Sequence, residues 1–112
     1  MIASDVIYEM LMETGMHPST KGFEFWELAI AHRVNGYRRG MCDLYTKIAN
    51  ETHSASRGSV ERAMRCSVDR VLSEASDNFY DWCYVSPETG RVTNKDFLEY
   101  AAREVKKKIE II

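Results

Sequence analysis

The sequence predicts an all-α fold, a compact bundle of about six helices that contains a helix-turn-helix. Three observations carry this prediction. Apolar residues recur at three- and four-residue spacing in six segments, and no segment sustains the alternation of a half-buried strand. With 112 residues, of which 45% are hydrophobic, the chain has enough apolar material for one core. We therefore expect one domain over residues 1–112.

The first three helices are predicted from apolar stripes and from the residues that bound them. Ser4 can cap the first helix, and Gly15 suits a left-handed residue after its end. The second helix runs from Lys21 to about Val34, and a short third helix from Met41 to about Thr52. Their inward positions are Val6, Ile7, Met10 and Leu11; Phe23, Trp26, Leu28, Ala29, Ile30 and Arg33; and Leu44, Ile48 and Ala49.

Three more helices follow a polar turn. Ser56 is a suitable N-cap for a helix that runs to about Glu74. Asp77 can cap a fifth, short helix, whose aromatic residues up to Tyr84 we expect in the core. Thr93 caps the last helix, which turns Phe97, Leu98, Ala101, Val105 and Ile109 inward.

The helix that follows Ser56 sorts its residues onto two faces. Wound at about 100° per residue, it gathers apolar and small side chains on one side and polar ones on the other. The inward set is Val60, Ala63, Met64, Ser67, Val68 and Val71, and the outward set is Arg62, Arg65, Cys66 and Asp69. The short helix before it and the turn between them give the order of a helix-turn-helix, whose second helix lies in the major groove of DNA.

Arginine suits base reading because its planar fork meets the O6 and N7 acceptors of guanine. Arg62 and Arg65 lie three residues apart, so both can point into one groove. Ser59 can add a hydroxyl contact, and Glu61 can accept from cytosine N4 or fix an arginine rotamer. The candidates for phosphate contacts, which position a protein without reading sequence, are Lys21, Lys47, Arg57 and Arg70.

The net charge and the N-terminal sequence limit the kinds of protein that this chain can be. The formal net charge of -2 argues against a polybasic protein that coats nucleic acid or membrane, so DNA binding must come from a local patch. The N-terminus carries acids where a signal peptide has basic residues, and no run is long enough to span a bilayer. We expect a cytoplasmic protein that uses no cofactor.

Four segments carry a resemblance to a known family. They are KGFEFWELAI, LYTKIA, SVERAMR and TNKDFLEYAAREV. In this order and at these separations they resemble the C-terminal DNA-binding (effector) domain of the stage zero sporulation protein A family, the master sporulation response regulators of endospore-forming bacteria. The resemblance implies a six-helix domain that binds short promoter boxes containing G·C pairs as tandem copies, and that activates or represses transcription. Because 112 residues leave no room for a receiver domain ahead of it, we expect a single helix-turn-helix DNA-binding domain over residues 1–112, with no receiver domain.

The resemblance also implies roles for three residues. The Glu and two Arg of the family's VER-x-x-R segment reach bases, which maps onto Glu61, Arg62 and Arg65. The position before Val60 is commonly Arg or another polar residue in the family, and here it is Ser59. The turn from residue 50 to 59 is about one residue longer than in the family, which shifts the depth at which the helix enters the groove.

Zinc binding and catalysis fit the sequence less well than DNA binding. A zinc site from Cys42, His53, Cys66 and Cys83 lacks close ligand pairs, so we expect no metal. Cys42 and Cys83 are expected to fill the core. The acidic pairs Glu24 with Glu27 and Asp77 with Asp81 adjoin no catalytic motif, so we expect no enzyme.

The main alternative is a small helical protein-protein interaction module that no longer binds DNA. It depends on the aromatic segment from Phe79 to Tyr84. Rings exposed there would offer a contact surface for a second copy on DNA or for RNA polymerase. Binding of duplex DNA with a base preference and a steep salt dependence discriminates the two functions.

Overall fold

The structure, a computed structural model, describes residues 3–53, 56–74 and 77–110, except for the side chains of residues 77 and 78. Six helices follow one another, and the described residues contain no strand, which confirms the all-α prediction. The helices are α1 (Ala3–Glu13), α2 (Lys21–Val34), α3 (Met41–Thr52), α4 (Arg57–Glu74), α5 (Asp77–Trp82) and α6 (Asn94–Glu110).

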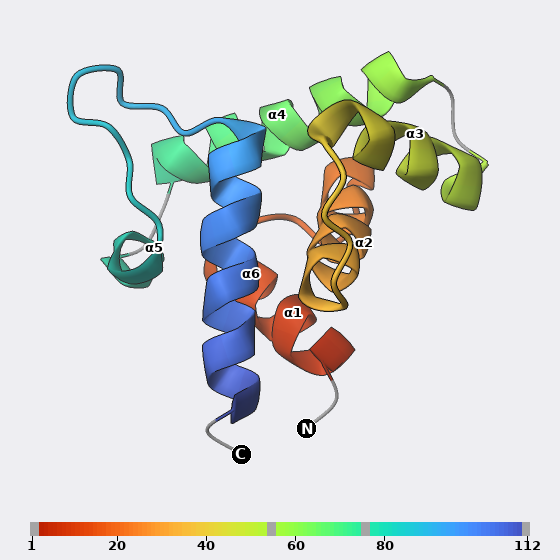
Figure 1. Cartoon of the computed structure of the whole chain (residues 1–112). Coiled ribbons are helices and arrows are strands. Elements are labelled where there is room, and N and C mark those ends of the chain that lie inside the picture. The colour runs from red at the N-terminus through yellow and green to blue at the C-terminus, as the bar shows by residue number, and fades with distance from the viewer. Residues whose placement is uncertain (1–2, 54–55, 75–76, 111–112) are drawn as a thin grey trace.

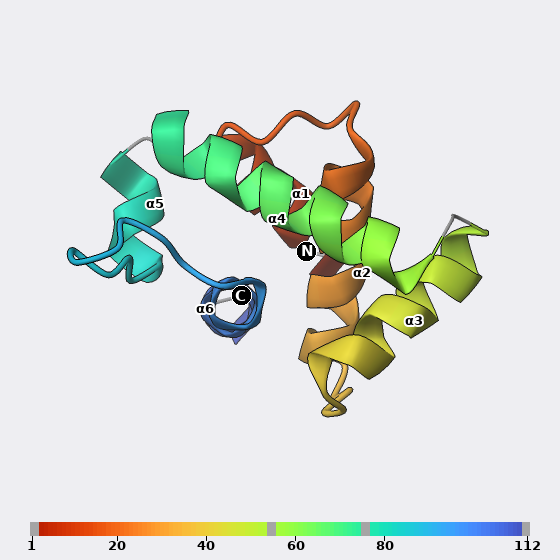
Figure 2. The same ribbon diagram turned by 90° about the horizontal axis from the view of Figure 1, so that it is seen from above.

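α2 and α6 pack side by side at the centre, and α4 lies across one end of this pair (Figure 1). α1 packs against α2 and α6 at the opposite end. Seen from above, α4 crosses the top of the molecule, α3 meets its N-terminal half, and the N-terminus of α6 lies beneath its flank (Figure 2). The arrangement therefore presents one whole side of α4 to the outside.

Trp26 is the point where α2, α4 and α6 meet. Its side chain is fully buried, and its indole Nε1 donates a hydrogen bond of 3.0 Å to the backbone oxygen of Met64 on α4. Its ring centroid lies 4.5 Å from that of Phe97 on α6, which in turn stacks on Phe79 of α5 at 6.1 Å. Aromatic contacts of this kind add to the energy of burial, so this cluster holds four helices in one core.

A glycine sets the distance between α2 and α4. A Cβ built on Gly22 would lie 1.8 Å from Ser67 Oγ and 2.8 Å from the backbone oxygen of Ala63. Only a residue without a side chain allows the two backbones to approach this closely. Gly22 therefore fixes how deeply α4 sits on the bundle.

Several of the capping residues predicted from the sequence are found at the helix ends. Gly15 has a φ of +89°, as a left-handed residue after α1 requires. The hydroxyl of Ser56 accepts from the backbone N–H of Ser59 at 3.2 Å, and that of Thr93 accepts from Asp96 at 3.1 Å. The predicted capping role of the Asp77 side chain lies outside what the structure describes.

Three sequence-based expectations are wrong. Ser4 is not the cap of the first helix, because α1 already includes Ala3. Cys42 is exposed, since it lies in the first turn of α3, before the first buried residue, Leu44, whereas Cys83 is buried as predicted. The aromatic segment is not all core: Phe79 is buried, but Tyr80 and Tyr84 are 51% and 64% exposed because α5 has only six residues and covers one side.

Two further residues that the pattern predicts to face inward are Arg33 and Ile109. Arg33 is buried as the second stripe predicted, and its charge is met by Glu99 at 3.3 Å from Nε and by the backbone oxygen of Tyr37 at 3.0 Å from Nη1. Ile109, near the end of α6, is half-buried.

No helix among the described residues is both long enough and apolar enough to cross a membrane.

Candidate nucleic-acid interface

α3 and α4 pack as the predicted helix-turn-helix requires. Ile48 and Ala49 of α3 share the core with Val60 and Met64 of α4, so the two helices are held by apolar contact close to the turn. His53 ends α3 in the left-handed conformation, with a φ of 53°. The turn that was predicted to be longer than in the family includes residues 54 and 55, which lie outside the described residues.

The two faces of α4 are sorted as predicted. Val60, Met64, Val68 and Val71 are buried, and Ala63 and Ser67 are half-buried. Ser59, Arg62, Arg65, Cys66 and Asp69 are exposed, as are Arg57 and Arg70. The exposed side of α4 is a strip that carries Arg62, Arg65 and Arg70; at 1.5 Å per residue, Arg62 and Arg70 lie about 12 Å apart along the helix. Arg57 is exposed at the start of α4.

Glu61 and Arg65 form a close pair on this strip. Oε1 of Glu61 accepts a hydrogen bond of 2.6 Å from Nη1 of Arg65, one helical turn further on. Glu61 is half-buried and lies on the flank of α4 toward α6. The ion pair restrains the exposed side chain of Arg65 along the helix.

Asn94, the first residue of α6, connects both helices of the pair. Its Nδ2 donates to the hydroxyl of Tyr45 on α3 at 3.1 Å and to the backbone oxygen of Glu61 on α4 at 3.3 Å. Burial is the main reason that the pKa of Tyr45 is raised above its ordinary value, so the hydroxyl stays protonated. Asn94 thus ties the backbone at Glu61 to the start of α6.

Two grooves flank α4, one on each side. The first, of about 240 Å³, lies toward α2 and is lined by Lys21, Cys66 and Arg70 among others. The second, of about 680 Å³, lies toward α6 and is lined by Glu61 and Arg65 among others. The structure therefore brings Lys21 and Arg70 together on one flank and Glu61 and Arg65 toward the other.

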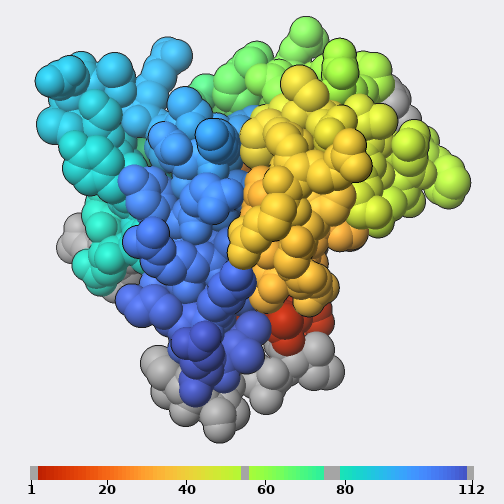
Figure 3. Space-filling model, viewed as in Figure 1, coloured from red at the N-terminus to blue at the C-terminus, as the bar shows by residue number. Residues whose placement is uncertain are grey.

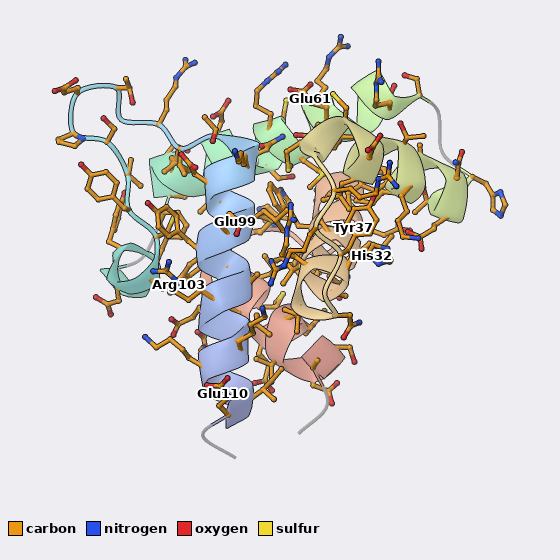
Figure 4. The ribbon with its side chains drawn as sticks, viewed as in Figure 1. His32, Tyr37, Glu61, Glu99, Arg103 and Glu110 are labelled. Carbon is orange, nitrogen blue, oxygen red and sulfur yellow. The ribbon has the colours of Figure 1, made fainter. Side chains whose placement is uncertain are left out.

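Lys47 lies apart from this strip. Its Nζ is 3.9 Å from Oε2 of Glu51 and 5.8 Å from the ring centroid of Tyr37. Tyr37 lies below α3, on the opposite side from the exposed strip of α4 (Figure 4). Of the four cations predicted to meet phosphate, Lys47 is thus the one held away from α4.

Several residues that shape this surface were missed by sequence reasoning. Gly22 and Asn94 lie in the segments KGFEFWELAI and TNKDFLEYAAREV, which indicate the family resemblance but do not by themselves indicate these contacts. Arg91 and Lys95 line the groove toward α6 together with Arg65. The sequence does hold a signal for these two cations, because each lies two residues from Thr93, the cap of α6.

Within the described ranges, no three His, Cys, Asp or Glu side chains are grouped closely enough to hold a metal ion. Burial raises the pKa of Glu27, and the neighbouring charge of Glu24 raises it further. Burial likewise raises the pKa of the Cys83 thiol to about 12, so this cysteine is not a reactive thiolate.

Comparison with known proteins identifies the family. No curated protein sequence matches the chain. A family model described as the sporulation initiation factor Spo0A C-terminal domain matches residues 7–105, a range that includes part of α1, all of α2 to α5 and most of α6. This family consists of DNA-binding effector domains that act in the regulation of transcription. The chain belongs to the Spo0A C-terminal domain family.

Proposed function

We propose that residues 1–112 act as one sequence-specific transcriptional regulator, which reads promoter boxes by placing α4 in the major groove of DNA. The observation that carries this proposal is the exposed strip of α4, with Arg62 and Arg65 on a helix whose other side is anchored by Val60 and Met64. A rigidly held helix presents its side chains in a fixed register, as base reading requires.

Each residue on the strip has a distinct role in this proposal. Arg62 and Arg65 donate to guanine O6 and N7, and the ion pair with Glu61 sets the direction of Arg65. Glu61 keeps a second oxygen with which it can accept from cytosine N4. Ser59, at the start of α4, modulates the choice of base through its hydroxyl.

The cations around the strip position the protein on the DNA backbone. Lys21 and Arg70 contact phosphates on the α2 side, and Arg57 contacts them near the start of α4. Lys47, which lies near Tyr37 and Glu51, makes a weaker and less direct contribution. The same proposal includes tandem copies on adjacent boxes, recruitment of RNA polymerase and a cytoplasmic location.

Fluorescence anisotropy tests the base-reading role. The chain is titrated onto a duplex with the family's promoter box and onto a scrambled duplex, each over a salt series. Arg65→Ala should weaken binding to the box by about 1–3 kcal/mol and relax base choice at one position. Lys47→Ala should weaken binding to both duplexes alike, by less.

The outcomes separate the two functions considered. Preference for the box in the unmodified chain, lost in Arg65→Ala, supports a base-reading helix. Equal losses on box and scrambled DNA in both variants would contradict the assignment of roles. Absence of binding to either duplex at low salt would instead favour the interaction module, with the exposed rings of Tyr80 and Tyr84 as its contact surface.

A further inference from the structure

We propose that Arg91 and Lys95 form a second contact with the DNA backbone, on the flank of α4 opposite Lys21 and Arg70. The proposal rests on the proposed function, because it assumes that α4 lies in the major groove. It adds to that function a loop and a helix start outside the helix-turn-helix.

The first step of the argument is the position of the two residues. Arg91 lies in the loop between α5 and α6, and Lys95 lies in the first turn of α6. Both line the groove that also holds Glu61 and Arg65. The loop rises on the side of the molecule that α4 occupies, and a hollow separates it from α3 with α4 behind (Figures 1 and 3). Arg91 and Lys95 thus stand beside the strip that reads bases.

The second step is that the loop holds its shape. Gly90 has a φ of +67°, and its N–H donates to the backbone oxygen of Ser86 at 2.7 Å. The N–H of Arg91 donates to Oγ1 of Thr89 at 3.2 Å. A turn closed in this way fixes the backbone at Arg91 while leaving its side chain to solvent.

The third step is that both charges are available to a ligand. Arg91 and Lys95 are exposed, and neither forms an ion pair with another described residue. The groove is lined by three acids, Glu61, Asp69 and Asp96, and by three cations, Arg65, Arg91 and Lys95, so its formal charge is zero. A polyanion would therefore be met by the exposed side chains of Arg91 and Lys95 and not by the groove as a whole.

The fourth step is the geometry of duplex DNA. The major groove is about 12 Å wide and is bordered by the phosphates of one strand on each side. A helix that lies in this groove has a row of phosphates along each of its flanks. Lys21 and Arg70 face one row from the α2 side, and Arg91 and Lys95 face the other row from the α6 side. The two pairs together would hold α4 between both strands.

The test compares two double variants with the same change in net charge. One is Arg91→Gln with Lys95→Gln. The matched control is Arg103→Gln with Lys107→Gln, which removes one Arg and one Lys from exposed positions further along α6. Lys107 lies twelve residues after Lys95, about 18 Å along the helix and away from α4; Arg103 lies between them (Figure 4).

Binding is measured by anisotropy on a duplex with a single box and on a scrambled duplex, between about 0.05 and 0.2 M salt. The Arg91/Lys95 variant should bind both duplexes roughly tenfold more weakly, and the slope of log K against log salt should fall in magnitude by about 1–2. The ratio of affinities for box and scrambled DNA should not change, since phosphates carry no sequence information. The control should keep the slope of the unmodified chain.

Three results would overturn the proposal. They are an unchanged slope in the Arg91/Lys95 variant, an equal fall in both double variants, or a loss confined to the box duplex. Circular dichroism melting confirms that both variants are folded before binding is measured. In each of these results the unmodified chain still prefers the box, so the proposed function stands; if the unmodified chain binds neither duplex, the proposed function fails as well.

Discussion

α4 and α6 are amphipathic helices of similar length, 18 and 17 residues, yet they use their exposed charges differently. On α6, Glu99 meets the buried Arg33 at 3.3 Å, and Lys108 meets Glu13 of α1 at 3.8 Å. Exposed charges of α6 therefore help to hold neighbouring helices. On α4, Glu61 and Arg65 form an ion pair within the helix itself.

This difference separates a supporting helix from the helix proposed to read DNA. A stripe of charge opposite an apolar stripe occurs on both, so amphipathicity alone does not identify a DNA-binding helix. What distinguishes α4 is that it lies across the end of the bundle (Figures 1 and 2) and that its Arg62, Arg65 and Arg70 are exposed. Substitutions on the two helices should therefore affect different properties, stability for α6 and DNA binding for α4.

The largest expected effect is on the inner side of α6. Phe97→Ala removes a fully buried ring whose centroid lies 4.5 Å from that of Trp26 and 5.8 Å from that of Trp82. We expect the free energy of unfolding to fall by about 3–5 kcal/mol, measured by urea denaturation. Arg62→Ala, on the exposed strip of α4, should change it by less than about 0.5 kcal/mol. Similar losses in both variants would show that α4 also supports the fold through its outer side.

An intermediate effect is expected where α2 meets α4. Gly22→Ala would place a methyl group 2.8 Å from a backbone oxygen that cannot rotate away, so α2 and α4 must separate. We expect a loss of about 1–3 kcal/mol in thermal melting, although alanine is the better helix former. Gly58→Ala is the matched control, since each glycine is the second residue of its helix and a Cβ on Gly58 would meet Ser56 Oγ at an ordinary contact distance of 3.7 Å. A gain of stability in Gly22→Ala would contradict the close contact.

The smallest effect is expected where the start of α6 contacts α4. Asn94→Ala removes the hydrogen bonds to Tyr45 and to the backbone of Glu61, and we expect a loss of about 1 kcal/mol in stability. Tyr45→Phe removes the first of these bonds and keeps the second. If the link to Glu61 orients Arg65, box preference in anisotropy should fall in Asn94→Ala and persist in Tyr45→Phe; an equal fall in both would assign the effect to α3.

Much of the fold could be predicted from the sequence because its signals are local. Stripes of apolar residues gave the bounds Lys21–Val34, Met41–Thr52 and Arg57–Glu74, and caps such as Ser56 and Thr93 act over three residues. The exposed arginines of α4 follow from the same periodicity.

The parts that sequence reasoning missed depend on contacts between distant residues. Asn94 reaches partners 49 and 33 residues earlier in the chain, and nothing in its neighbourhood marks that contact. Gly22 reads as a poor helix former until α4 is placed against it. Cys42 was misplaced because composition predicts burial for cysteine, whereas its position on α3 decides otherwise.

The separation of tasks on α4 has a consequence for how this domain can change. Ser59, Arg62 and Cys66 are exposed, while the fold depends on Val60 and Met64 beneath them. Because the residues proposed to recognise DNA differ from those that pack into the core, new side chains at the three outer positions can be tried without unfolding the bundle. A library varied at these positions alone would sample altered box preferences on one unchanged scaffold.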